Sequence, residues 1–259
     1  MVSSLRSSIK APQILRVILF IALASLLYGY FTNSNENNPR KGRNFRRPKF
    51  PKAPKQNITM ASTYLQAIAG RRSIYALQKS STISDARIQE ILTETIKYSP
   101  SSFNSQSSRA VLLLNSEHDK LWDIGHDAIK NNLPDAYNNL KPKLDGYKAA
   151  YGTVLWFEDQ ETLDGMKSKN PGMPFDQWSE HSIGMLQIHT WDTFSLEGLG
   201  ANLQHYNFIP NFSKQVKENW SLPEKWDLKG QLVFGTPNGA PREKTFLPVE
   251  GTRLLVYGQ

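Results

Sequence analysis

Apolar residues recur at helical spacing in three stretches of the chain after residue 59. The clearest stretch begins at Ser84, a residue type that favours the helix N-cap, and ends at Pro100, which cannot continue a helix. Between them, Ile88, Ile91 and Leu92 form one apolar stripe at the 3.6-residue period. The pattern therefore predicts helices over 64–69, 84–99 and 179–196.

Short runs of β-branched and aromatic residues predict four strands. The runs cover residues 110–114, 153–157, 231–235 and 254–257. Together with the helices they favour the α+β class, with a central, mainly antiparallel sheet surrounded by helices. About 200 residues follow the first sixty, which is enough for one domain with a substantial core.

The N-terminal part of the chain has a different pattern. Residues 14–31 are almost wholly apolar, and about eighteen such positions approach the length that crosses the roughly 30 Å core of a bilayer. Arg16 lies near the start, and Tyr28 and Tyr30 suit the opposite membrane interface. We expect one N-terminal transmembrane helix over 14–31, after a basic flank at 1–13. A cleaved targeting signal is the alternative, although no convincing small-residue cleavage site precedes the charged stretch.

Residues 32–58 have the composition of a linker, rich first in asparagine and then in proline and basic residues. Eight Lys and Arg residues fall between Asn33 and Lys55, and they account for the formal net charge of +8. A basic strip beside a membrane helix suits anionic lipid headgroups. We therefore expect residues 14–31 and the linker to bind a membrane and no specific nucleic acid. The folded domain is expected over 59–259.

The distribution of positive charge bears on location. Three basic residues, Arg6, Lys10 and Arg16, lie before or at the start of the apolar span and eight follow it, which favours the matrix or cytosolic side for the folded domain. The acid-free start, with arginine and serine, resembles a mitochondrial targeting segment. Anchoring in a mitochondrial membrane and in an endomembrane both stay open, and a soluble protein released by N-terminal processing is the alternative.

Composition and motifs exclude several kinds of chemistry. The chain has no cysteine, so disulfides, thiolate metal sites and a cysteine nucleophile are excluded. The five histidines lack the spacing of a metal site, and the chain has neither a Gly-x-Ser-x-Gly elbow nor a Gly-x-Gly-x-x-Gly turn after a strand. We therefore expect no metal ion, no catalytic side-chain dyad and no Rossmann domain.

The stretch 98–106 has the composition of a ligand-binding loop. It follows the helix that begins at Ser84 and gathers small hydroxyls, a proline and two amides. Such groups, on a loop between a helix and a strand, suit the edge of a flat heterocycle or a sugar chain. An ordinary Ser/Asn turn is the alternative. The candidate residues are Pro100, Ser101, Ser102, Asn104 and Gln106.

Three further segments carry candidate chemistry. Paired arginines beside a serine follow the helix at 64–69; they suit a phosphate monoester, although such pairs are also common at a solvated helix end. A glycine after the helix at 179–196 permits close approach of the backbone to a ligand plane, or simply caps the helix. A cationic loop covers 241–248. The candidates in these segments are Arg71, Arg72, Ser73, Tyr75, Glu197, Gly198 and Lys244.

In this order, the four segments resemble the flavin site of the FMN-dependent nitroreductase family, over about 59–259. The stretches 178–187, 198–206 and 226–235 resemble the fungal branch of that family. The resemblance implies that Arg71 and Ser73 contact the flavin phosphate and ribityl chain and that Lys244 completes the phosphate clamp. It also implies that Glu197 and Gly198 approach the N5 and O4 edge of the flavin.

The resemblance further implies an assembly. Residues 100–102 match the segment that typically reaches the flavin of the partner subunit, and Asn104 and Gln106 match the amides that follow. We therefore expect an intertwined homodimer with two flavins at its interface and the helix at 179–196 at the seam. The expected fold class is α+β, nitroreductase-like, with a central, mainly antiparallel sheet surrounded by helices, plus one N-terminal transmembrane helix.

The function that the resemblance implies is that of an FMN-dependent oxidoreductase. In such enzymes NADH or NADPH delivers hydride to flavin N5, and the electrons pass to a nitroaromatic, a quinone or a similar small acceptor, without a side-chain acid or base. Tyr75, Phe246 and the pair Ser107 and Ser108 replace a lysine, an arginine and Pro-Trp of bacterial relatives, which removes positive charge. A regulatory protein of the same fold, linked to oxidative stress or lipid and with little turnover, is therefore the alternative.

Overall fold

One long strand, β5, organises the sheet of this protein. The computed structural model describes residues 60–258. Residues of β5 pair with β3 on one side and with β4 on the other, and the strand order is β1-β5-β3-β2, with every pair antiparallel. The elements in chain order are α2 (Met60–Gly70), β1 (Leu77–Gln78), α3 (Asp85–Tyr98), η1 (Ser102–Asn104), β2 (Ser108–Leu114), α4 (Asn115–Asn132), α5 (Pro134–Lys148), β3 (Gly152–Asp159), α6 (Gln160–Lys169), α7 (Phe175–Leu196), β4 (Gly200–Gln204), η2 (Tyr206–Phe208), α8 (Phe212–Asn219) and β5 (Trp226–Pro237).

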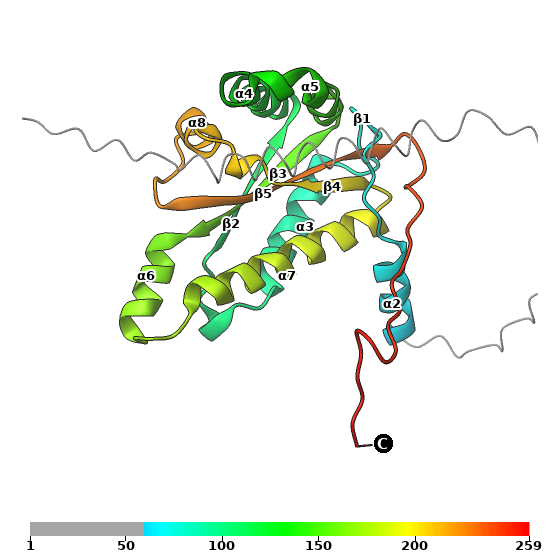
Figure 1. Cartoon of the computed structure of the whole chain (residues 1–259), viewed down its shortest axis with the longest axis vertical. Coiled ribbons are helices and arrows are strands. Elements are labelled where there is room, and N and C mark those ends of the chain that lie inside the picture. The colour runs from blue at the N-terminus through cyan, green and yellow to red at the C-terminus, as the bar shows by residue number, and fades with distance from the viewer. Residues whose placement is uncertain (1–59, 259) are drawn as a thin grey trace, which may run out of the picture. The chain divides into compact units, whose positions relative to one another are not determined.

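Helices cover both faces of the sheet. α4, α5 and α8 lie on one face, and α3 and α7 lie on the other (Figure 1). Side chains alternate along β3, so that Leu155 and Phe157 pack into the first core while Val154 and Trp156 pack into the second. Because full burial of a large apolar side chain contributes roughly 1.5–3 kcal/mol, these two cores hold the sheet firmly between its helical layers.

The local signals in the sequence predicted several elements correctly. The Ser84 hydroxyl accepts a hydrogen bond from the backbone N–H of Arg87 at 3.2 Å, and α3 ends at Tyr98, just before Pro100. The strands predicted over 110–114, 153–157 and 231–235 lie inside β2, β3 and β5. The prediction of an antiparallel sheet covered by helices is confirmed, although α7 begins at Phe175, four residues earlier than expected.

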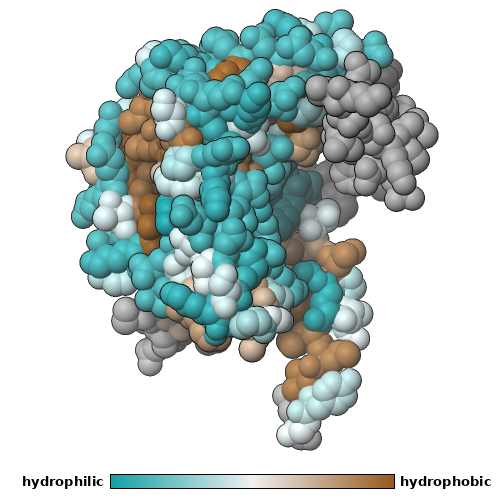
Figure 2. All heavy atoms as spheres, turned by 90° about the vertical axis from the view of Figure 1, so that its left-hand side faces the viewer, coloured by the Kyte–Doolittle hydropathy of each residue, from teal (hydrophilic) through white to brown (hydrophobic). Residues whose placement is uncertain are grey.

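The strand predicted over 254–257 is wrong. Only an isolated bridge joins Leu254 to Glu250, and Tyr257 is 87% exposed. After β5 the chain leaves the sheet, and its exposed apolar residues form the segment that projects at the lower right of Figure 2. The fourth and fifth strands are instead β4 and the two-residue β1. A run of β-branched residues predicts a strand only where a sheet edge of the same chain is within reach.

The expected fold class needs a second correction. The transmembrane helix predicted over 14–31 lies outside the described residues, and no helix within 60–258 combines the length and the apolar character needed to cross a membrane. The fold class of residues 60–258 is therefore corrected to an α+β domain with an antiparallel sheet and covering helices.

His118 of α4 is fully buried and holds α5 against β3. Its Nε2 lies 3.1 Å from the carbonyl oxygen of Tyr147, and its Nδ1 lies 3.0 Å from the Thr153 hydroxyl. A carbonyl only accepts, so Nε2 carries the hydrogen and Nδ1 accepts from the hydroxyl. Burial lowers the pKa of His118 from its ordinary value of 6.5 to about 4, so the ring is neutral in the folded protein.

Replacement of His118 by glutamine is expected to flatten the acid side of the stability profile. Between pH 6.5 and pH 4 the unfolded chain binds a proton at His118 that the folded chain does not bind, so the wild type loses about 3 kcal/mol over this range. Glutamine keeps a donor and an acceptor but does not titrate. Denaturant unfolding at pH 6.5, 5 and 4 measures the difference. Equal pH slopes for both proteins would contradict a neutral buried His118.

Candidate functional site

The paired arginines lie where β4 meets the segment that follows β5. The backbone N–H of Ile74 donates to the Ala201 carbonyl at 2.9 Å, and the Asn202 side chain donates to the Ile74 carbonyl at 2.8 Å. On the other side, the N–H of Asn238 donates to the Ala76 carbonyl at 2.8 Å. Three of the four segments singled out in the sequence therefore lie together.

A pocket of about 300 Å³ opens between these segments. Four of its ten lining residues are glycines from different segments of the chain, so backbone atoms form part of its wall. The Arg72 side chain lines the pocket and donates a hydrogen bond to the Arg242 carbonyl. The lining residues are Gly70, Arg72, Ile74, Ser195, Gly198, Leu199, Gly200, Pro237, Gly239 and Pro241.

Arg71 does not line this pocket and packs on α7. Its guanidinium carbon lies 4.5 Å from the ring centre of Trp191, and its Nε lies 3.5 Å from Oδ1 of Asp192. Both of these atoms are buried, yet neither makes a hydrogen bond. Burial raises the pKa of the Asp192 carboxyl, and the charge of Arg71 opposes that shift. Arg71 therefore offers a partly buried cation whose hydrogen-bonding capacity is not used up.

Cations cover the two aromatic residues that stand at positions where bacterial relatives are expected to carry charge. The Arg242 guanidinium carbon lies 5.2 Å from the ring centre of Tyr75. Nζ of Lys244 lies 5.2 Å from the ring centre of Phe246, in the exposed segment after β5. Positive charge is therefore present beside both aromatic rings, although it comes from residues after β5.

Glu197 and Gly198 form the end of α7. The N–H groups of Gly198 and Leu199 donate to the carbonyls of Ser195 and Phe194 at 3.2 and 2.9 Å, which is the Schellman pattern of helix ends. Gly198 has φ +83°, so the cap by itself accounts for a glycine here. The Glu197 carboxylate accepts from Arg87 of α3 at 2.6 Å and does not point freely into the pocket.

The loop 100–106 is strained. Phe103, Asn104 and Gln106 have φ values of 56°, 52° and 52°, a left-handed conformation that costs non-glycine residues on the order of 1–3 kcal/mol each. The Ser101 hydroxyl accepts from the backbone N–H of Gln106 at 2.9 Å, which closes the loop on itself. Phe103 is exposed and stacks on Trp178 with ring centres 6.2 Å apart.

Arg109 of β2 holds this loop, a role that the sequence analysis did not predict. Its Nη1 donates to the carbonyls of Gln106 and Ser108 at 2.6 and 3.1 Å, while its Nη2 pairs with Asp159 at 2.7 Å. Its one signal in the sequence is its position, as a charged residue directly before the apolar run 110–114. The clamp fixes the loop carbonyls and so maintains the strained conformation.

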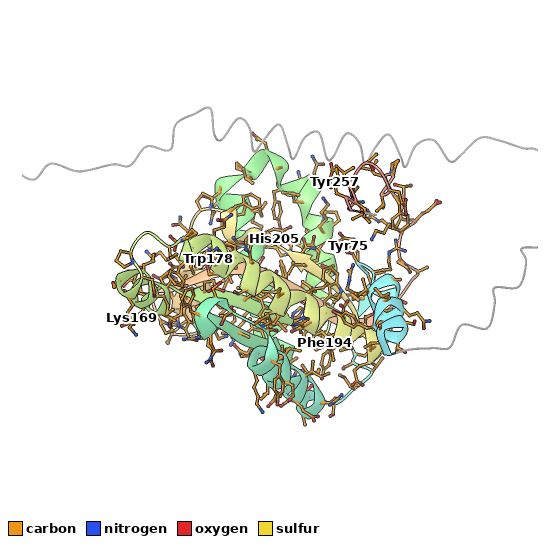
Figure 3. All side chains as sticks on the ribbon, turned by 90° about the horizontal axis from the view of Figure 1, so that it is seen from below. Tyr75, Lys169, Trp178, Phe194, His205 and Tyr257 are labelled. Atoms are coloured by element: carbon orange, nitrogen blue, oxygen red, sulfur yellow. The ribbon has the colours of Figure 1, made fainter. Side chains whose placement is uncertain are left out.

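The loop and the arginine segment lie at opposite ends of the helical layer. Arg87, at the start of α3, contacts Glu197, whereas Pro100, Ser101 and Gln106, beyond its end, line a pocket of about 570 Å³ with Ser182 of α7. A helix of the length of α3 spans about 20 Å. In Figure 3, Trp178 and Phe194 mark the two ends of α7, with Tyr75 on the Phe194 side. Within one chain, Arg72 and Gly198 therefore line the same pocket, and the loop 100–106 lies at the other end of the helical layer.

Known proteins resemble this chain in sequence and in fold. Residues 68–236 match the model of the nitroreductase family. The Saccharomyces cerevisiae proteins HBN1 and FRM2 are 35% and 34% identical to this chain, over 73% of it and 96% of their own lengths. The fold also matches the nitroreductase CinD from Lactococcus lactis in complexes with nicotinic acid, chloramphenicol and 4-nitrophenol.

For these complexes the TM-scores are 0.68, 0.67 and 0.65, at 35–36% identity, and the match covers 75% of this chain and all of CinD. A more distant protein from Desulfovibrio desulfuricans, solved with FMN, has the same fold at 18% identity, with a TM-score of 0.56 over 75% of this chain and 97% of its own. The chain described here therefore belongs to the nitroreductase family.

Proposed function

We propose that this protein is an FMN-dependent oxidoreductase that transfers two electrons from NADH or NADPH to a nitroaromatic, a quinone or a similar small acceptor. The observation that carries the proposal is the pairing of a glycine-walled pocket with paired arginines at one end of α7. Family membership and the ring-containing ligands of the CinD complexes support the same reaction class. A bound flavin would supply the hydride chemistry at its N5.

The residues present fit a flavin mononucleotide. Arg71 has a buried Nε without an acceptor, and Arg72, Arg242 and Lys244 add positive charge in the neighbouring segments. A terminal phosphate monoester is the group that such donors bind best. At Gly70, Gly198 and Gly239 of the pocket, the nearest atoms to a built Cβ lie 3.6 Å away or farther, which leaves room for a flat ring to approach the backbone. In this assignment Arg71, Ser73 and Lys244 bind the phosphate, and the pocket wall orients the ring.

The alternative, a regulatory protein of the same fold with little turnover, depended on the loss of charge at Tyr75 and Phe246. The cations Arg242 and Lys244 next to these rings weaken that reason. A site that retains its positive charge has no electrostatic cause to bind the flavin nucleotide poorly. This favours the enzyme over the regulator.

A homodimer explains why the loop and the arginine segment lie far apart in one chain. In a dimer, Ser101 and Gln106 of one subunit complete the site of the other. Large apolar side chains exposed on α2, on the end of α7 and along the segment after β5 support such an interface, because contiguous apolar surface is costly in water. The residues are Tyr64, Leu65, Ile68, Leu196, Phe246, Leu247, Leu255, Val256 and Tyr257.

Loss of two cations is expected to release the flavin. Charge-assisted hydrogen bonds to phosphate contribute roughly 1.5–3 kcal/mol each, so the double variant Arg71→Ala with Lys244→Ala should bind FMN at least a hundredfold more weakly. Flavin absorbance per protein and fluorescence titration of the apoprotein measure the effect. Lys148→Ala removes a cation that pairs with Asp123 on α4, and it serves as the control. A double variant that keeps its full flavin complement would contradict the phosphate assignment.

Stopped-flow absorbance tests the reaction itself. Mixing the oxidised flavoprotein with NADH or NADPH should bleach the flavin absorbance, and a nitroaromatic or a quinone added afterwards should restore it. The faster donor identifies the nicotinamide preference. A protein that neither donor reduces would favour the regulatory alternative.

Removal of residues 246–259 is expected to produce a folded monomer with little flavin, because the sheet ends at Pro237 and residues 246–258 are exposed. Light scattering after size exclusion should give twice the mass of 29.4 kDa for the full chain and a single mass for the truncated one. As a control, Glu250→Gln in the same segment should leave the dimer intact. A dimeric truncated protein with normal flavin content would exclude this segment from the interface.

A further inference from the structure

Two consecutive residues of α7 hold Arg71. Trp191 provides a flat surface 4.5 Å from the guanidinium carbon, and Asp192 provides a carboxylate oxygen 3.5 Å from Nε. The side chains of Arg71 and Asp192 are only 18% and 7% exposed. The backbone N–H of Arg71 also donates to the Ala67 carbonyl at the end of α2, at 3.0 Å. Neighbouring residues therefore contact the flat face of the guanidinium, its Nε and the backbone of Arg71.

The contact with Asp192 is looser than the other arginine ion pairs of the domain. Arg109 and Asp159 approach to 2.7 Å, and Arg87 and Glu197 to 2.6 Å, both at hydrogen-bond distance. Asp192 remains 3.5 Å from Arg71, and neither its Oδ1 nor the Nε makes a hydrogen bond. The carboxylate therefore attracts the guanidinium without consuming its donors. A guanidinium has five N–H groups, so a second anion can bind it as a fork.

Fixing a free arginine side chain costs up to about 2 kcal/mol of conformational entropy. An arginine that is already held on α7 meets that cost during folding and not during ligand binding, which raises affinity without a new contact to the ligand. Trp191 limits the guanidinium to one plane, and Asp192 limits its rotation within that plane. Arg71, Trp191 and Asp192 do not line the glycine-walled pocket, whereas Arg72, the next residue after Arg71, does. Trp191 and Asp192 therefore influence the site only through their contacts with Arg71.

We propose that Asp192 and Trp191 are positioning residues that hold Arg71 ready for the phosphate of the flavin nucleotide. This inference rests on the proposed binding of FMN by Arg71. It makes Asp192 a determinant of phosphate affinity, although it is an acid and does not touch the phosphate. It also separates two properties of the site, because Asp192 governs recognition of the phosphate and not of the flavin ring.

Comparison of FMN with riboflavin tests the proposal. Apoprotein of the full chain is titrated with each flavin, and quenching of flavin fluorescence gives the two dissociation constants. Asp192→Asn keeps the shape of the side chain and removes its charge. It should weaken FMN about tenfold, which corresponds to about 1.4 kcal/mol, and should change riboflavin affinity by less than twofold. Asp123→Asn removes a carboxylate that pairs with Lys148 on the opposite face of the sheet, and it should change neither constant.

Variants of Trp191 provide a second, independent measurement. Trp191→Phe keeps a flat ring under the guanidinium and should retain most of the preference for FMN over riboflavin. Trp191→Leu removes the flat ring and should reduce that preference. A structural defect would lower both affinities together in either variant, so the ratio of the two constants reports on the positioning of Arg71.

The outcomes separate this inference from the proposed function. If Arg71→Ala leaves FMN affinity unchanged, the phosphate assignment fails and the positioning role fails with it. If Arg71→Ala weakens FMN but Asp192→Asn does not, only the positioning role is overturned. Equal weakening of FMN and riboflavin by Asp192→Asn, or tighter FMN binding, would also overturn it, since the first indicates a general structural role and the second a competition with phosphate.

Discussion

The candidate site depends on the close approach of three backbone segments at one pair of glycines. Gly200 of β4 and Gly235 of β5 lie opposite each other in the sheet. A Cβ at Gly235 would stand 2.5 Å from the carbonyl oxygen of Gln78, and one at Gly200 would stand 2.9 Å from the side chain of Leu77. At Gly235 the clash is with backbone, so only glycine permits Gln78 to pack across β5. At Gly200 a larger residue would force the Leu77 side chain to move. This packing brings the paired arginines, the end of α7 and the segment after β5 together.

Such long-range packing also marks the limit of prediction from the sequence. The ends of α3 were predictable because Ser84 and Pro100 act on their immediate neighbours. β4 was missed because Gly200–Gln204 has few strand-forming residues, and its conformation comes from pairing with β5. The run 254–257 was misassigned for the opposite reason, since it has strand-forming residues but pairs with no strand within residues 60–258.

The candidate residues could be proposed singly, but their contacts could not. Paired arginines, glycines after a helix and an amide-rich loop are each visible in the sequence, and the fold brings three of these segments together. Asp192 and Arg109 gave no comparable signal, because an acid on a helix and an arginine in a strand are ordinary surface residues until the fold buries them. Gly198 shows a second limit of such prediction, since the left-handed conformation at the end of α7 accounts for a glycine at this position without any ligand.

The loop 100–106 and the side chain of Arg71 are both restrained in the protein without a ligand, but by different contacts. The loop 100–106 stores backbone strain that Arg109 restrains, whereas Arg71 is restrained by a ring and a carboxylate of α7. The remaining positive charge comes from Arg242 and Lys244, on a segment whose side chains are exposed. If Arg71 binds the flavin phosphate as proposed, its restrained guanidinium would fix the position of that anion, and Arg242 and Lys244 would add to the positive potential around it. The segment after β5 also carries exposed apolar residues, whose burial against another surface is favourable. A surface that binds this segment would therefore also fix the positions of Arg242 and Lys244.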